Sequence, residues 1–97
     1  MDKMHRFIYS NPDGSSCVVQ KYIERPLLFK GRKFDIRIYA ICTTKNEVYF
    51  YKEGYLRMSS NQYDVKSSDL QTHLTNTGIQ KHNPNYGKYE QGNILSF

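Results

Sequence analysis

Three ionisable residues occupy every second position of a short apolar stretch. Lys33, Asp35 and Arg37 alternate with Phe34 and Ile36. In a β-strand, residues two apart point to the same face and lie about 6.6 Å from each other. Lys offers a point charge for phosphate, and Arg offers a planar fork for phosphate or carboxylate. An Asp between them can accept from a ribose hydroxyl or an amine. The row could therefore hold an extended, multiply charged ligand.

A plainer interpretation of this row stays open. It is a solvated sheet face with local ion pairs, which contribute little to stability. Nucleic acid fits poorly, because Asp35 lies in the middle of the row and no aromatic platform with basic neighbours accompanies it. The three histidines have no metal-ligand spacing with the cysteines. The sequence also has neither a P-loop nor a dinucleotide-binding glycine motif.

The pattern around the row predicts mainly antiparallel strands. Alternation from Lys33 to Thr43 predicts one half-buried strand, with Phe34, Ile36 and Ile38 packed into a core. A turn at 45–46 and a second alternating run predict a hairpin. The other expected elements are strands at Val18–Ile23, 47–52 and Tyr55–Ser59, a turn at 30–31, a helical turn at 67–70 and a surface loop over 82–93.

Composition narrows the class of protein. The 97 residues allow one small domain at most, whose own core would be marginal. The net charge of +5 indicates an acidic partner, which could be a nucleotide, nucleic acid, a membrane surface or an acidic peptide, or only a basic solvated face. Cys17 and Cys42 form no CxxC pair and are expected to be small buried residues in a reducing compartment. No run approaches a membrane span or a signal peptide, so we expect a soluble intracellular protein without a membrane partner.

Several motifs follow one another in a specific order. They are VVQKYIERPLL at 18–28, GRKFDIR at 31–37, EGYLR at 53–57, HLTN at 73–76, IQK at 79–81 and NYGKYE at 85–90. In this order they resemble the tubulin–tyrosine ligase-like family, with Lys52 in place of an arginine before EGYLR. The resemblance covers Cys17 to Phe97, and the segment 1–16 matches nothing in it.

The resemblance implies an α+β fold, namely a partial ATP-grasp domain of mainly antiparallel strands with long loops. Residues 17–97 would be the central part of this domain, incomplete at both ends. In this family ATP activates a carboxylate as an acyl-phosphate, and an amine attacks it to form an amide. The implied partners are ATP, a free amino acid and the acidic C-terminal tail of tubulin, which suits a chain of charge +5. Nucleic acid and membranes are not expected partners. The implied location is the cytoplasm and cytoskeleton, with the cilium as a further site.

The amino acid that is added is inferred from one motif. The NYGKYE segment favours addition of tyrosine. The alternatives are a tubulin polyglutamylase or polyglycylase, or a non-catalytic remnant that binds nucleotide or tubulin.

The resemblance also assigns roles to individual residues. The adenine hinge and the rest of the ATP site would be formed by Gln20, Lys21, Tyr22, Ile23, Lys33, Asp35, Thr75 and Asn76. Arg37 would bind the carboxylate of the protein substrate, and Arg57 the incoming amino acid or the tail. No catalytic residue and no metal ligand is assigned, because the phosphate-binding lysine and the Mg²⁺ ligands of the family fall outside these motifs. The 97-residue chain alone is therefore expected to be inactive and to fold poorly.

Overall fold

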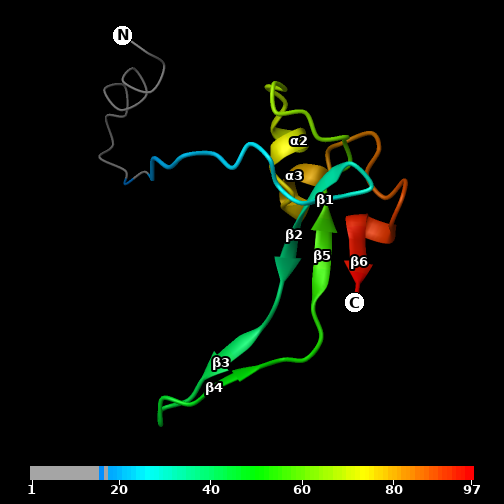
Figure 1. The fold of residues 1–97 in the computed structure, drawn as a ribbon. Helices are drawn as coiled ribbons and strands as arrows, with labels where there is room; N and C mark the ends of the chain where they lie inside the picture. Colours follow the sequence, from blue (N-terminus) through cyan, green and yellow to red (C-terminus); the bar gives the residue numbers. More distant parts are fainter. Residues whose placement is uncertain (1–15, 17) are drawn as a thin grey trace.

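The computed structural model describes residue 16 and residues 18–97, and its centre is a four-stranded antiparallel sheet (Figure 1). The strand order is β1-β2-β5-β6, formed by β1 (Leu28–Phe29), β2 (Arg32–Arg37), β5 (Tyr55–Met58) and β6 (Ile94–Ser96). A separate two-stranded sheet contains β3 (Ala40–Cys42) and β4 (Val48–Phe50). The helices are short: α2 (Leu70–His73), α3 (Thr77–Gln80) and the 3-10 turn η1 (Gln91–Asn93). The predicted class, α+β with mainly antiparallel strands and long loops, is confirmed.

The turn between β1 and β2 fixes the register of the charged row. Lys30 and Gly31 have φ values of 49° and 75°, the left-handed conformation required at both central positions of a type I′ turn. Leu28 therefore lies opposite Lys33, and Phe29 opposite Arg32. The predicted turn at 30–31 is confirmed.

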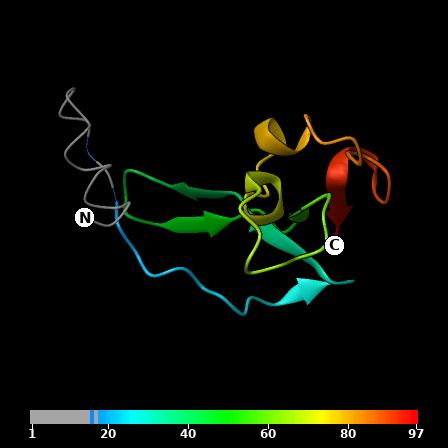
Figure 2. The same ribbon diagram turned by 90° about the horizontal axis from the view of Figure 1, so that it is seen from above.

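The long strand predicted for 33–43 is two strands. β2 ends at Arg37, β3 begins at Ala40, and the chain then pairs with β4 through a turn in which Asn46 has a φ of 61°. The predicted hairpin is thus confirmed, but it projects away from the four-stranded sheet (Figures 1 and 2). The break allows the chain to leave one sheet and enter the other.

The predicted apolar core around β2 is wrong in part. Phe34 is half-buried, but Ile36 and Ile38 are 59% and 54% exposed. Both helices and the C-terminal loops gather at the other end of the sheet, where β2 begins and β5 ends (Figure 1). Within the described residues, Met58 is the one hydrophobic side chain that is fully buried.

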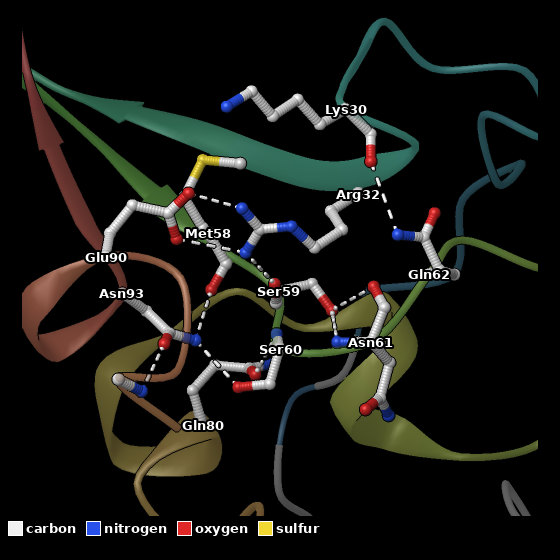
Figure 3. A network of polar contacts seen from close by, with 11 residues as sticks. Lys30, Arg32, Met58, Ser59, Ser60, Asn61, Gln62, Gln80, Glu90 and Asn93 are labelled. Carbon is white, nitrogen blue, oxygen red and sulfur yellow. Dashed lines mark hydrogen bonds and ion pairs between the residues drawn. The ribbon is translucent and has the colours of Figure 1, made fainter. Parts of the chain in front are cut away.

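Polar side chains, amides among them, form most of the interior at that end. Gln80 is fully buried, and it accepts from the Ser60 backbone N–H at 2.8 Å and donates to the Gln71 and Leu74 carbonyls. Asn93 donates to the Met58 carbonyl and to Ser60 Oγ (Figure 3). Buried polar groups are tolerated when every donor and acceptor is satisfied, and no described buried side-chain N or O lacks a partner.

A buried ion pair lies in the same region. Arg32 is 2% exposed, forms a bidentate pair with Glu90 and donates to the Ser59 carbonyl at 3.1 Å (Figure 3). Its guanidinium lies over the Tyr89 ring, 4.5 Å from the ring centroid. The surface loop predicted over 82–93 therefore contributes buried groups, because Asn83 and Asn93 are buried as well.

Other expectations differ from the structure. The segment Val18–Ile23 is not a strand but an exposed, irregular stretch, and Cys42 is exposed rather than buried. Cys17 lies outside the described residues. The strand predicted at 55–59 is confirmed as β5, and the helical turn predicted at 67–70 starts slightly later, with Asp69 capping α2. Neither α3 nor β6 was predicted. Among the described residues, no helix has the length and apolar character needed to cross a membrane.

Candidate functional site

The charged row lies on one face of the four-stranded sheet. Lys33, Asp35 and Arg37 occupy alternate positions of the continuous strand β2. The antiparallel register with β5 places Arg57 opposite Asp35 and Tyr55 opposite Arg37. Arg57, predicted from a separate motif, therefore joins the same face.

Asp35 is the centre of a compact cluster. Arg57 Nε donates to Asp35 Oδ1 at 2.7 Å, and Thr75 Oγ1 donates to Asp35 Oδ2. The side chains of Arg57 and Asp35 are 19% and 33% exposed, and Thr75 is buried. The hydrogen bond to Asp35 raises the pKa of the Arg57 guanidinium further, so this group is charged at every accessible pH. The structure thus brings together residues from β2, β5 and the segment after α2.

Lys33 lies at the other end of the row and holds a second cluster. Its Nζ donates to the Tyr22 hydroxyl at 3.1 Å and to the His73 backbone carbonyl at 2.9 Å. The Tyr22 hydroxyl also lies 2.7 Å from His73 Nδ1. The side chain of Lys33 is half-buried between Tyr22, in the irregular stretch before β1, and His73 at the end of α2.

The segment 20–23 lies beside Lys33. Gln20, Lys21, Tyr22, Ile23 and Lys33 line a hollow of about 280 Å³. Within the described residues, the backbone N–H and C=O groups of 20–23 make no hydrogen bond, so they are available to read the edge of a ligand. The hollow is slightly smaller than the roughly 300–1,000 Å³ of ordinary ligand pockets.

Two of the predicted site residues have exposed side chains with fewer contacts. Arg37 is exposed, and no ion pair to it is formed by another described residue. Asn76 is exposed and precedes α3 without a side-chain capping bond. Both side chains are therefore free to meet a ligand from solvent.

The sequence did not single out every residue that shapes this face. His73 was assigned no role from the sequence, because its contacts with Tyr22 and Lys33 are visible only in the tertiary structure. On the opposite face of β2, the pairing of Arg32 with Glu90 was also missed, because 58 positions separate them. The motifs HLTN and NYGKYE did contain two of these residues, and that is the signal by which they could have been found.

The described residues include groups of the kinds that bind nucleotides. Lys33 and the free backbone of 20–23 are groups that bind phosphate and a base edge. In the described part of the chain, no three His, Cys, Asp or Glu side chains gather closely enough to hold a metal ion.

Comparison with known proteins identifies the family. Residues 1–95 match the Tubulin-tyrosine ligase family. The chain is 46% identical over 81 residues to the protein polyglycylase TTLL10 of Macaca fascicularis, covering 81% of this chain and 13% of that protein. It is 43% identical over 88 residues to the human tubulin monoglycylase TTLL3, covering 84% of this chain and 11% of that protein.

A relative of a different specificity is more distant. The human tubulin polyglutamylase TTLL7 is 35% identical over 88 residues, covering 84% of this chain and 10% of that protein. The chain thus spans between 10% and 13% of the length of these three curated relatives. On the family match over nearly all of its residues, the chain belongs to the tubulin-tyrosine ligase family.

Proposed function

We propose that this chain is part of an ATP-dependent ligase that adds glycine to glutamate side chains of tubulin tails. Tyrosine, the first choice from the sequence, is less well supported than the alternative of a glycylase or polyglutamylase. The identities of 43–46% to two glycylases favour glycine. The identity of 35% to a polyglutamylase makes glutamate the second candidate.

The observation that carries this proposal is the shared face of Lys33, Asp35, Arg37 and Arg57. Lys33, at the wall formed by Gln20, Lys21, Tyr22 and Ile23, would contact the phosphates of ATP. Asp35 would accept from the ribose, with Thr75 and Asn76 beside it. Arg57 would hold the carboxylate of the incoming amino acid, and exposed Arg37 that of the tail. One face would thereby hold all three substrates side by side.

The proposed reaction needs these substrates in contact. A tail carboxylate oxygen attacks the γ-phosphorus of ATP and releases ADP, forming an acyl-phosphate. The amine of the amino acid then attacks the acyl carbon, phosphate leaves, and an amide bond remains. The described residues bind and orient the substrates by fixed charges, which is where most of the rate enhancement of phosphoryl transfer originates.

Place and partners follow from the same proposal. The enzyme would act on the acidic tail of tubulin at the cytoskeleton, in the cytoplasm or in cilia, and the net charge of +5 would favour encounter with that tail. Residues 17–97 would be the central part of its ATP-grasp domain. Magnesium would be held by residues outside those described here.

Labelled amino acids test this proposal directly. The full natural polypeptide that contains residues 1–97 is incubated with tubulin, ATP and labelled glycine, glutamate or tyrosine in parallel. Glycine should be incorporated only when ATP is present, and removal of the tubulin tails should abolish incorporation. Incorporation of glutamate alone would select the second candidate, and incorporation of none of the three would overturn the proposal.

A further inference from the structure

His73 has a defined proton arrangement. Its Nε2 lies 2.8 Å from the Ser67 backbone carbonyl, which can only accept a hydrogen bond, so Nε2 carries the proton. In the neutral ring Nδ1 is then an acceptor, and the Tyr22 hydroxyl 2.7 Å away donates to it. Lys33 Nζ donates in turn to the Tyr22 oxygen at 3.1 Å. With a neutral His73 ring, each of these three hydrogen bonds has one compatible direction of donation.

The same histidine holds the two groups proposed to bind ATP. Its ring accepts from Tyr22, and its backbone carbonyl accepts from Lys33 at 2.9 Å. Its ring also makes edge-to-face contacts with Tyr22 and Tyr63, with centroids 5.3 and 5.9 Å apart. Lys33 Nζ lies over the Tyr22 ring at 4.8 Å from the centroid.

The extended segment has few other attachments. Ile23 is 72% exposed, and the backbone of 20–23 forms no hydrogen bond to another described residue. Its second anchor is the Tyr63 hydroxyl, which donates to the Glu24 carbonyl at 2.8 Å. Desolvation raises the pKa of Tyr63, so this hydroxyl stays a donor at neutral pH. Among the described residues, Tyr22 and Glu24 are therefore the two points at which side-chain hydrogen bonds attach this stretch to the rest of the structure.

We propose that His73 is a positioning residue for the nucleotide, which holds the segment 20–23 and Lys33 at a fixed separation by accepting from Tyr22. This inference rests on the proposed function, because it assumes that those residues bind ATP. His73 touches no substrate in this role. It acts through Tyr22, and its effect should fall on the affinity for ATP rather than on the tail.

Two substitutions separate the two ring nitrogens. In His73→Asn, the side-chain Oδ1 takes approximately the place of Nδ1 and can still accept from Tyr22. In His73→Gln, the side-chain Nε2 takes approximately the place of the ring Nε2, so it can donate to Ser67 but offers Tyr22 no acceptor. Both variants keep the backbone carbonyl that Lys33 contacts.

The test uses the full natural polypeptide that contains residues 1–97, with ATP affinity measured by calorimetry. A lost hydrogen bond of ordinary strength predicts that His73→Gln raises the Kd for ATP about five- to tenfold. His73→Asn should stay within about twofold of the unmodified protein. The KM for a tail peptide should be unchanged in both. His82→Gln, at an exposed histidine, is the matched control and should change nothing.

A double-mutant cycle guards against general misfolding. Tyr22→Phe should also raise the Kd for ATP. The double variant, Tyr22→Phe with His73→Gln, should bind ATP as tightly as Tyr22→Phe alone. Equal loss of ATP affinity in His73→Asn and His73→Gln would overturn the inference, and so would fully additive effects in the cycle. Failure of the unmodified protein to bind ATP would instead overturn the proposed function, which keeps the two failures apart.

Discussion

Arg57 donates to Asp35 from the directly opposite position of the neighbouring strand, at 2.7 Å, and Thr75 donates to the other carboxylate oxygen. The two charged residues were assigned to different substrates, Asp35 to the nucleotide and Arg57 to the amino acid. Their ion pair means that the two proposed subsites share a wall.

Removing Arg57 should therefore affect both substrates. In Arg57→Ala, Asp35 loses its positive partner and its negative charge faces the nucleotide phosphates, so the KM values for ATP and for the amino acid should both rise, by about tenfold each. Initial-rate kinetics with one substrate varied at a time measure this. Lys45→Ala, which removes one positive charge at the distant β3–β4 turn, is the control. A rise in the amino-acid KM alone would contradict the shared wall.

Substitutions of Lys33 and Arg37 should affect different substrates, although the two residues lie only two positions apart. Lys33→Ala removes a cation from the proposed phosphate site and a bond to Tyr22, so the Kd for ATP should rise at least about tenfold. Arg37→Ala should leave the Kd for ATP unchanged and raise the KM for an acidic tail peptide, most strongly at low salt. Calorimetry with ATP and peptide kinetics at two salt concentrations check this pair. The opposite pattern would refute both assignments.

The buried pair of Arg32 and Glu90 should matter for stability rather than for binding. Glu90→Ala leaves a guanidinium that is only 2% exposed without its partner, and a loss of about 3–5 kcal/mol in the free energy of unfolding is expected. Urea denaturation of the full natural polypeptide that contains residues 1–97 measures this loss. Glu53→Ala, at an exposed carboxylate, should cost less than about 0.5 kcal/mol. Equal stability of the two variants would show that Arg32 is hydrated or paired elsewhere.

The stability of the fold should depend on the side-chain N–H donors of Gln80 as well as on the volume of this side chain. Gln80→Glu preserves the volume but places a carboxylate oxygen against the Gln71 and Leu74 carbonyls, which the amide nitrogen now contacts at 2.7 and 2.6 Å. A loss of at least about 2 kcal/mol is expected at neutral pH. Acidification should restore part of it, because a protonated carboxyl can donate again. Gln91→Glu, on an exposed side chain, is the control, and no difference between the two variants would contradict the amide network.

The sequence by itself determined the local features of the site. Period-two alternation placed Lys33, Asp35 and Arg37 on one face, and that follows from strand geometry alone. The turn at 30–31 and the hairpin around 45–46 were equally local, since Gly and Asn favour the left-handed conformations found there. The ordered motifs also identified the family, because their order is a property of the chain and not of its packing.

Only the tertiary structure decided which distant residues meet. The partners of Asp35, Lys33 and Arg32 lie 11 to 58 positions away in the chain, and no local periodicity encodes such pairs. The same limit explains the errors at Ile36 and Ile38, whose alternation predicts burial but says nothing of which segments arrive to cover them. In this chain, helices and loops cover the end of the sheet where β2 begins and β5 ends, and the side chains buried there are mostly polar. The physical reason is that alternation sets the direction of a side chain, whereas burial and pairing depend on where the rest of the chain folds.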